Sequence, residues 1–287
     1  MLTVQVLMST YNGEKYLKEQ IDSVVSQTGI EVHLLVRDDG SKDGTVDILK
    51  CYRNDIPNIE IMEGENIGST KSFLELVKSA GDYDFYAFAD QDDVWDADKL
   101  SIAIDRLKNC SCPAIYSGNT RLVDGELKFI KNETLKPVTT LGSAIVKNYV
   151  TGCTTVFNAE LMKYLKRYSP WYAPFHDWWA NLVCLAVGGV SIYDYEPHMS
   201  YRQHGNNVVS GNDSAWKKWT SRLKKFNRPY CRDLMAKEIL TVYSDSISMD
   251  RKKPLELVIC RKSTYDMTTG NKIDDLLFKI CLLFGKQ

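Results

Sequence analysis

Hydrophobic and polar residues alternate in blocks over the first hundred residues, and these blocks predict strands and helices in turn. Four short apolar runs have the length and composition of buried strands. They cover residues 2–9, 32–36, 59–62 and 84–89. Between them, apolar residues recur at helical spacing, which predicts helices around residues 16–25, 45–52 and 69–77. The alternation is typical of βαβ units, so we expect a mainly parallel sheet with right-handed crossovers and helices on both faces.

The pattern is less regular from residue 99 onward. Further strands are expected at 114–117, 151–157, 190–193 and 199–204, and helices at 99–107, 139–146, 159–165 and 176–187. The more polar stretch 120–136 suggests a hairpin or an excursion. Beyond about residue 214 the apolar positions are helical throughout, at 216–228, 230–245 and 273–284.

This change of character predicts two parts. A first domain covers residues 1–214, with one half at about 1–110 and another at about 111–214, and a helical extension covers 215–287. Glycines at 205 and 211 bound a loop that has the hinges expected of a lid.

Composition limits the class of protein and the compartment in which it works. A hydrophobic fraction of 44% over 287 residues is enough for a large core, and a net charge of −1 gives no global field for nucleic acid. The eight cysteines contain no CxxC pair, so we expect mostly buried thiols in a reducing compartment rather than a zinc site or disulfide framework. The chain starts directly with a strand-like run and has no apolar stretch of about 20 residues, so we expect a cytoplasmic protein.

The apolar run 84–89 ends abruptly in Asp90, Asp92 and Asp93. Three carboxylates this close repel one another, and a divalent cation at the carboxyl end of a parallel strand would compensate them. The sequence therefore suggests a metal site for a phosphate-bearing ligand. The alternative is a solvated acidic turn, in which Asp93 or Asp96 caps the next helix.

Other polar clusters follow the other predicted strands and should share the same sheet edge. A carboxylate such as Asp38 or Asp39 can accept a hydrogen bond from a pyrimidine imide, and the ring of Tyr11 can stack on a base. Asp-Asp-Gly-Ser is also an ordinary turn with an Asp cap, which remains the alternative. The chain has no GxGxxG after its first strand, no GxxxxGK[ST] and no GxSxG, so dinucleotide, P-loop and nucleophile-elbow sites are not supported.

Taken together, the clusters resemble glycosyltransferase family 2. The matching motifs are STYNG at 9–13, QIDS at 20–23 with QT at 27–28, RDDGSKDG at 37–44, NIG at 66–68 and DQDDVW at 90–95. The resemblance is firm over residues 3–105. It continues through HDWW at 176–179 and YRQHGN at 201–206, which look like a bacterial branch with many rhamnosyltransferases.

The resemblance implies an α/β protein of the GT-A fold, with a mainly parallel central sheet flanked by helices and a helical C-terminal extension. It implies that residues 1–214 are the catalytic domain, with a nucleotide-sugar half at about 1–110 and an acceptor half at about 111–214. It also implies a site for a nucleoside diphosphate sugar and a divalent metal, Mg²⁺ or Mn²⁺. The implied donor-binding residues are Thr10, Tyr11, Asn12, Asp38, Asp39, Lys71, Asp90, Gln91 and Arg202. The implied metal ligands are Asp92, with Asp93 and His204 to complete the shell.

The same resemblance makes Asp177 the general base. An inverting transferase must deprotonate an acceptor hydroxyl, and a carboxylate suits that role. A helix N-terminus would lower the pKa of Asp177, whereas the pocket beside Trp178 would raise it. The alternative is that Asp177 only caps the helix. For Arg202 and His204 the alternative is that they satisfy loop backbone at a strand end.

We therefore expect an inverting transfer of a sugar to a carbohydrate hydroxyl in bacterial surface polysaccharide synthesis, with dTDP-L-rhamnose as the first donor. UDP-hexoses or UDP-N-acetylhexosamines are the alternative donors. A nucleotidyltransferase and a non-catalytic nucleotide-sugar-binding module are more distant alternatives. A nucleotidyltransferase should have a glycine-rich basic loop early in the chain, and this chain has none there. The acceptor is a glycan, free or lipid-linked. The tryptophan-rich basic helix 216–228 either contacts the inner face of a membrane or packs as an ordinary solvated helix.

Overall fold

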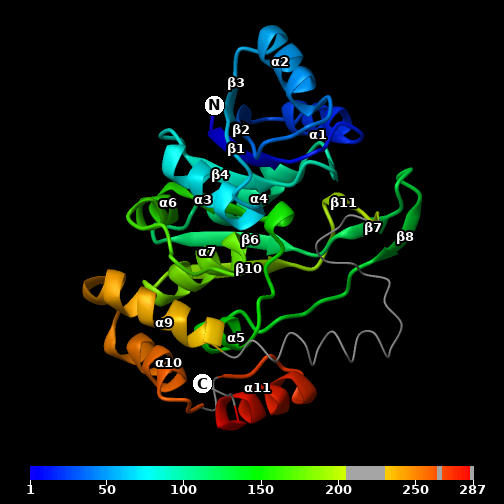
Figure 1. Cartoon of the computed structure of the whole chain (residues 1–287). Helices are drawn as coiled ribbons and strands as arrows, with labels where there is room; N and C mark the ends of the chain where they lie inside the picture. The colour runs from blue at the N-terminus through cyan, green and yellow to red at the C-terminus, as the bar shows by residue number, and fades with distance from the viewer. Residues whose placement is uncertain (205–229, 264–266, 285–287) are drawn as a thin grey trace.

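A computed structural model describes residues 1–204, 230–263 and 267–284 (Figure 1). The expected lid 205–211 and the expected basic helix 216–228 lie outside the described residues. In the described part, apolar strands form one large sheet and one small sheet, and helices cover the large one.

The large sheet has seven strands in the order β10-β6-β9-β4-β1-β2-β3. The strands are β1 (Thr3–Thr10), β2 (Glu31–Asp38), β3 (Ile59–Glu63), β4 (Phe85–Ala89), β6 (Ala114–Gly118), β9 (Val156–Asn158) and β10 (Val190–Asp194). All neighbours are parallel except β9, which runs antiparallel to both β4 and β6. The prediction of a mainly parallel sheet is confirmed. The predicted strand 151–157 is wrong in its first half, where a 3-10 helix, η1 (Gly152–Thr154), precedes β9.

Helices pack on both faces of this sheet, as the alternation predicts. They are α1 (Leu17–Val25), α2 (Thr45–Asp55), α3 (Ser69–Ser79), α4 (Lys99–Leu107), α5 (Leu141–Val146), α6 (Ala159–Lys166) and α7 (His176–Ala186). Side chains of α1, α2 and α4 belong to the core on one face, and those of α3, α5, α6 and α7 to the core on the other. Helix α3 begins at Ser69, and Gly68 takes its N-cap position with a φ of 85°, a backbone conformation that favours glycine.

The small sheet holds a late segment beside the acidic stretch. Its order is β5-β11-β7-β8, with β5 (Val94–Trp95), β11 (Met199–Arg202), β7 (Arg121–Val123) and β8 (Phe129–Asn132). Strands β7 and β8 form the hairpin expected within 120–136. Strand β11 pairs antiparallel with β5, which directly follows Asp93. This pairing carries Arg202 and His204 to the end of β4.

Three C-terminal helices complete the described chain: α9 (Tyr230–Tyr243), α10 (Met249–Ile259) and α11 (Lys272–Phe284). Figure 1 shows them next to α5 and α7, at the opposite end of the molecule from β3 and α2. Buried residues of all three, including Ile239, Leu255 and Phe278, join the core that α5 and α7 form on the sheet. Across the described ranges, no helix combines the length and apolarity needed to cross a membrane.

The cysteines differ from expectation. Of the six with a described environment, Cys153 and Cys184 are buried, Cys51 and Cys260 are exposed, and the other two are intermediate. The prediction of mostly buried thiols is therefore wrong for this part of the chain. All six are free cysteines.

Candidate active site

The candidate site lies where β1, β2 and β4 end, because parallel strands place the loops that follow them along one sheet edge. Thr10 is paired in register with Asp38 on the neighbouring strand. The ladder extends one residue further, since the Asp39 N–H donates to the Thr10 carbonyl oxygen at 2.8 Å. The clusters that sequence reasoning placed together are thus adjacent.

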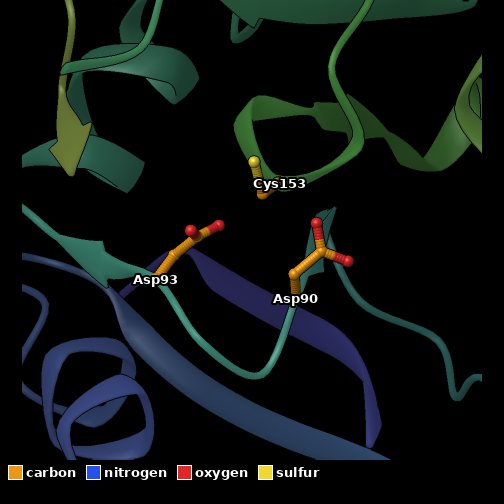
Figure 2. A group of neighbouring side chains, drawn as sticks. All are labelled: Asp90, Asp93 and Cys153. Atoms are coloured by element: carbon orange, nitrogen blue, oxygen red, sulfur yellow. The ribbon is translucent and has the colours of Figure 1, made fainter. Parts of the chain in front are cut away.

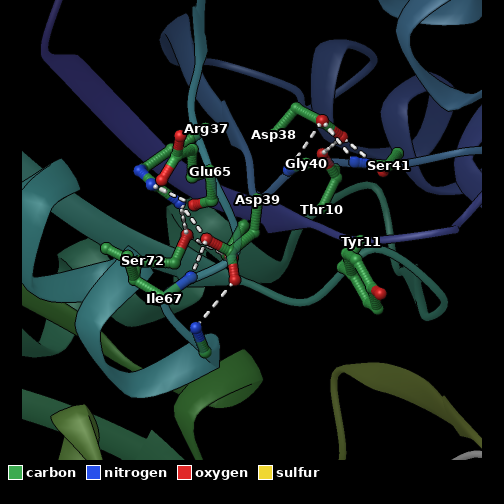
Figure 3. Close-up of polar contacts among 12 residues, drawn as sticks. Thr10, Tyr11, Arg37, Asp38, Asp39, Gly40, Ser41, Glu65, Ile67 and Ser72 are labelled. Atoms are coloured by element: carbon green, nitrogen blue, oxygen red, sulfur yellow. Dashed lines mark hydrogen bonds and ion pairs between the residues drawn. The ribbon is translucent and has the colours of Figure 1, made fainter.

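Asp38 and Asp39 are both buried, and each carboxylate organises a loop (Figure 3). Asp38 accepts hydrogen bonds from the Thr10 hydroxyl at 3.1 Å and from the N–H groups of Gly40 and Ser41 at 3.1 and 2.8 Å. It therefore does cap its own turn, as the alternative interpretation held. Its expected contact with a pyrimidine stays a prediction.

Asp39 faces the other way and joins β2 to the loop before α3. Its carboxylate pairs with Arg37 and accepts from the N–H groups of Ile67 at 3.0 Å and Gly68 at 2.9 Å. These bonds fix the NIG segment against the end of β2 (Figure 3). Its expected recognition of a base likewise stays a prediction.

Tyr11 presents a partly exposed ring, 46% accessible, from a turn with a fixed backbone. The Gln91 side chain accepts from the Tyr11 N–H at 2.8 Å and donates to its carbonyl oxygen at 3.0 Å. A Cβ at Gly13 would lie 2.3 Å from Gln91 Oε1, so glycine is needed for this approach. The amide of Asn12 is also engaged, because its Oδ1 accepts from the Lys42 N–H at 2.8 Å. A base stacked on Tyr11 would therefore meet a rigid platform.

The start of α3 adds a cation to this edge. Lys71 is exposed in the first turn of α3, shortly after Gly68. No acidic partner of Lys71 occurs among the described residues. The neighbouring Thr70 hydroxyl donates to the Pro174 carbonyl oxygen at 3.1 Å, which ties α3 to the loop before α7. The helix that carries Lys71 is therefore tied to the loop that leads into the helix of Asp177.

The acidic stretch is folded so that two of its carboxylates point together. Asp90, Asp93 and Cys153 bring one ligand atom each within 4.8 Å of one another (Figure 2). Burial, followed by the like charges of its neighbours Asp92 and Asp177, raises the pKa of Asp90. Burial likewise raises the pKa of Asp93, with repulsion from Asp92 and Asp90 added. The alternative of a solvated acidic turn is wrong for Asp93, which is fully buried and caps no helix.

Asp92 has a different partner. Its Oδ2 lies 2.7 Å from Nε2 of His204, which follows β11. Among the described residues, Asp92, Asp93 and His204 do not gather into one three-ligand group. Asp90 instead lies with Asp93, while His204 lies with Asp92. The assignment of Asp92, Asp93 and His204 as metal ligands stays a prediction.

Arg202 is buried under this loop rather than exposed at its mouth. Its backbone N–H donates to Asp93 Oδ1 at 3.1 Å, and its guanidinium donates to the Asp92 carbonyl oxygen at 2.9 Å. The guanidinium also bonds the Gly125 carbonyl oxygen at 2.7 Å and pairs with Glu19. These bonds hold the acidic loop in place, and a grip on a diphosphate stays a prediction.

A lysine lies behind the carboxylates. Lys99 is buried, and its Nζ sits 3.4 Å from the centre of the Trp95 ring without a hydrogen-bond partner in the described chain. Burial lowers its pKa to about 7, while nearby Asp93 favours its charged form. The Oδ2 atom of Asp93 also lacks a hydrogen-bond partner within the described residues. This buried carboxylate is thus only partly compensated by protein groups.

Asp177 is the second residue of α7 and is buried. Its Oδ1 accepts a hydrogen bond from the Asn148 amide at 3.0 Å, and the Gly152 N–H also bonds its carboxylate. Burial outweighs these bonds and raises the pKa of Asp177 to about 6. The capping alternative holds in part: Phe175 takes the N-cap position, but Asp177 Oδ1 accepts a hydrogen bond from the Trp178 N–H at 2.6 Å in the first turn of α7. A carboxylate with this pKa accepts a proton readily near neutral pH.

A divalent cation fits the acidic loop. Mg²⁺ and Mn²⁺ prefer carboxylate oxygens, and Asp90, Asp92 and Asp93 offer them where like charges repel, with Asp93 buried and the other two partly buried. The unpartnered Oδ2 of Asp93 is a further oxygen that a cation would satisfy. Burial raises the pKa of the Cys153 thiol well above its usual value, which favours the neutral thiol.

The sequence did not predict three residues that contact Asp177 or the acidic loop. Asn148, Gly152 and Cys153 come from a segment between two short elements and contain no family motif. One signal was available: Gly152 interrupts an apolar run, and an isolated glycine there often marks a close backbone approach. A Cβ at Gly152 would lie 2.9 Å from His176 Nε2 and 3.5 Å from Asp177 Oδ2.

Comparison with known families decides the class. The model of the family described as "Glycosyl transferase family 2" matches residues 5–168. The chain belongs to glycosyl transferase family 2. It is thus a nucleotide-sugar glycosyltransferase of an inverting family, and the resemblance drawn from the motifs is confirmed.

Two curated relatives illustrate the range of the family. The chain is 30% identical to dTDP-rhamnosyl transferase RfbG of Shigella flexneri, over 72% of this chain and 75% of the relative. It is 28% identical to the UDP-Glc:alpha-D-GlcNAc-diphosphoundecaprenol beta-1,3-glucosyltransferase WfgD of Escherichia coli, over 53% of this chain and 58% of the relative.

Solved structures confirm the fold. S. aureus TarS in complex with UDP-GlcNAc matches with a TM-score of 0.62 and 20% identity, covering 91% of this chain and 72% of that one. Mannosyltransferase PcManGT from Pyrobaculum calidifontis, in complex with GDP-Man and Mn²⁺, matches with a TM-score of 0.55 and 15% identity. The latter match covers 99% of this chain and 88% of the other. The predicted GT-A fold is therefore confirmed.

Proposed function

We propose that this protein transfers L-rhamnose from dTDP-L-rhamnose to a carbohydrate hydroxyl during bacterial surface polysaccharide synthesis. The observation that carries the choice of donor is the likeness to a dTDP-rhamnosyl transferase over 72% of the chain. The acceptor is a glycan, and a lipid-linked one is supported by the diphosphoundecaprenol-linked acceptor in the name of WfgD.

The geometry supports direct displacement with Asp177 as the base. Asp177 has a pKa of about 6 and lies close enough to Asp90 for its charge to raise the pKa of Asp90. The base and the donor loop therefore share one site. Asp177 takes the proton of the acceptor hydroxyl while Asn148 holds its other oxygen in place.

The donor binds across the edge formed by β1, β2 and β4. Tyr11 supplies the stacking surface, Asp38 and Asp39 shape the base pocket, and Lys71 approaches the phosphates. A divalent cation held by Asp92, with Asp90, Asp93 or His204, would offset the charge that grows on the leaving diphosphate. Asp90 and Gln91 lie beside the ribose or sugar, and Gln91 also keeps the Tyr11 turn in place.

A second donor class is supported by other relatives. TarS was solved with UDP-GlcNAc, and WfgD is named for UDP-Glc, so a UDP-hexose or UDP-N-acetylhexosamine is the alternative donor. These proteins share the fold and the family with this chain but differ in their sugars. Side chains from several loops shape the sugar pocket, so the family alone does not fix the sugar.

A donor screen tests the proposal. Hydrolysis and transfer should be measured for dTDP-L-rhamnose, UDP-glucose, UDP-GlcNAc and GDP-mannose, each with Mn²⁺, with Mg²⁺ and with EDTA. We expect dTDP-L-rhamnose to give the highest kcat/KM, and EDTA to reduce turnover by at least tenfold. Preference for a UDP-sugar would overturn the rhamnose assignment, and full activity in EDTA would overturn the metal assignment.

A further inference from the structure

A cavity of about 260 Å³ lies between α3, the end of α6 and the start of α7. None of the donor-site residues lines it. Its wall includes His176, whose Nε2 atom is turned toward Gly152 beside Asp177. The cavity therefore lies behind the first turn of α7, separate from the edge where β1, β2 and β4 end.

The interior of the cavity is apolar. Leu74 and Val77 from α3, Leu165 from α6 and Phe88 from β4 contribute hydrophobic walls. One polar group interrupts them: Trp179 is 1% exposed and its indole N–H has no hydrogen-bond partner among the described residues. A buried donor without an acceptor is unfavourable, and an oxygen atom of a ligand would satisfy it.

The mouth of the cavity is cationic. Lys78, Lys166 and Arg167 line it, and no acidic residue does. Lys166 donates to the Ala80 carbonyl oxygen and lies 3.9 Å from Asp82, whereas Lys78 is exposed and makes a long ion pair of 4.0 Å with Glu75. Arg167 stacks 5.6 Å from the centre of the Tyr164 ring, and no carboxylate in the described chain pairs with it. Arg167 can therefore pair with an anion directly, and Lys78 can do so by leaving its long, exposed contact with Glu75.

The charge at this mouth does not come from His176. Burial lowers the pKa of His176 to about 3, so the imidazole is neutral at physiological pH. Its ring stacks on Phe73 at 3.8 Å and meets Phe88 edge-on at 4.6 Å. His176 therefore acts as an aromatic part of the wall, and the positive charge is confined to the outer end of the cavity.

We propose that this cavity binds a small anionic amphiphile, an apolar chain or ring that carries one phosphate, sulfonate or carboxylate group. The apolar part fills the space between α3 and α7, and the anion pairs with Lys78 and Arg167. The volume is below the range of about 300–1,000 Å³ typical of sites for drug-sized ligands, so the occupant is small. Charge complementarity excludes neutral and cationic ligands as the preferred class.

The test uses the full chain and the fluorescent anion 1-anilinonaphthalene-8-sulfonate. We expect saturable binding of one probe per chain, unchanged by saturating dTDP with Mg²⁺. The double variant Lys78→Glu with Arg167→Glu should raise Kd at least tenfold. Lys163→Glu is the matched control, because Lys163 is an exposed cation of α6 outside the cavity and should leave Kd unchanged. Equal weakening by both variants, or loss of binding with dTDP, would overturn the proposal.

A second variant and two competitors sharpen the result. Leu74→Trp fills the cavity from α3 and should abolish probe binding while the chain still unfolds cooperatively. Farnesyl phosphate represents a prenyl-lipid source of the ligand, and phenyl phosphate represents a small aromatic source. Displacement of the probe by one but not the other identifies the source. If neither competitor displaces it at millimolar concentration, the proposed ligand class is wrong.

Discussion

At the scale of single residues, the protonation of Asp177 controls the proposed reaction. Its pKa of about 6 means that the base is ionised above that pH and protonated below it. We expect kcat at saturating donor to rise about tenfold per pH unit below 6 and to level off above it. A rate profile between pH 4.5 and 8 measures this. A flat profile through pH 6 would contradict Asp177 as the base.

Replacing Asp177 should separate activity from stability. Asp177→Asn should lower kcat by about 10²-fold or more, because the amide cannot take a proton. Burial raises the folded-state pKa from 3.8 to about 6, so Asp177 favours the folded state below about pH 4, and this contribution is lost as pH rises through about 6. At pH 8 the neutral asparagine avoids a cost of about 3 kcal/mol at most. The variant should therefore melt higher than the natural protein at pH 8.

The same comparison at pH 4.5 provides the internal check. There the native carboxyl is mostly protonated, so the difference in Tm between the two proteins should shrink. Asp105→Asn, at an exposed position of α4, is the matched control and should shift Tm little at either pH. A variant that melts lower at pH 8 would show that the hydrogen bonds to the carboxylate outweigh its burial.

Gly152 is the residue whose role emerged only from the fold. Gly152→Ala places a Cβ 2.9 Å from His176 Nε2, an atom of a packed ring that cannot easily move. We expect a loss of about 1–3 kcal/mol in stability and a fall in kcat as Asp177 is displaced. Gly125→Ala is the control, since it meets only the Tyr16 hydroxyl at 3.2 Å. Normal kcat with lowered stability would confine Gly152 to a packing role.

The sequence predicted the residues that belong to short motifs and missed those that do not. Asp90 to Asp93 and Asp177 stand in distinctive local patterns, so their chemistry could be argued from the residue types and their spacing. Asn148 is an ordinary polar residue that reaches Asp177 only because α5 packs against α7. Likewise, the partners of Arg202 come from residues 19, 92 and 125, which only the fold brings together.

At the scale of elements, one side chain joins the loops that follow β1 and β4. Gln91 makes two hydrogen bonds with the backbone of Tyr11, so Gln91→Ala should free this turn. At about 1 kcal/mol for such bonds, we expect the Kd of dTDP with Mg²⁺ to rise roughly fivefold. Calorimetric titration measures the change. Lys50→Ala, on the outer side of α2, is the control and should leave Kd unchanged.

Elements with clear periodicity were predicted well, and those shaped by neighbours were not. The helix predicted at 99–107 is the helix observed, whereas the apolar run 151–157 divides into η1 and β9. Its first residues turn so that the Gly152 N–H reaches Asp177, and this tertiary contact overrides the strand-like pattern. The sequence did not predict helix α10 at all, because Pro254 lies inside it and its apolar positions do not form one stripe.

At the scale of the whole molecule, the site depends on pairings between distant segments. The pairing of β5 with β11 joins residues about a hundred positions apart and delivers His204 to Asp92. The β1, β2 and β4 loops, by contrast, meet through the general geometry of parallel sheets. The sequence could therefore predict the donor edge as a group, but it could place the later residues only by family resemblance.

The C-terminal helices provide the last prediction at this scale. A chain truncated after residue 214 keeps the proposed catalytic domain but loses α9, α10 and α11. It would expose core positions such as Trp178, which packs near Arg232, and Val146, whose carbonyl oxygen accepts from that arginine at 2.8 Å. Because these helices share one core with α7, the truncated chain should lose cooperative unfolding and nucleotide binding together.

Circular dichroism melting and dTDP titration of the truncated chain measure both properties, with the full chain as reference. The substitution Met235→Ala offers a milder test, since Met235 is buried in the shared core and lies outside the donor edge. It should cost about 2–5 kcal/mol of stability while leaving Kd for dTDP unchanged below the melting transition. If the truncated chain instead melts cooperatively and binds dTDP normally, residues 215–287 form a separable unit. In that case α7 would fold and hold Asp177 in place without the core that it shares with the C-terminal helices.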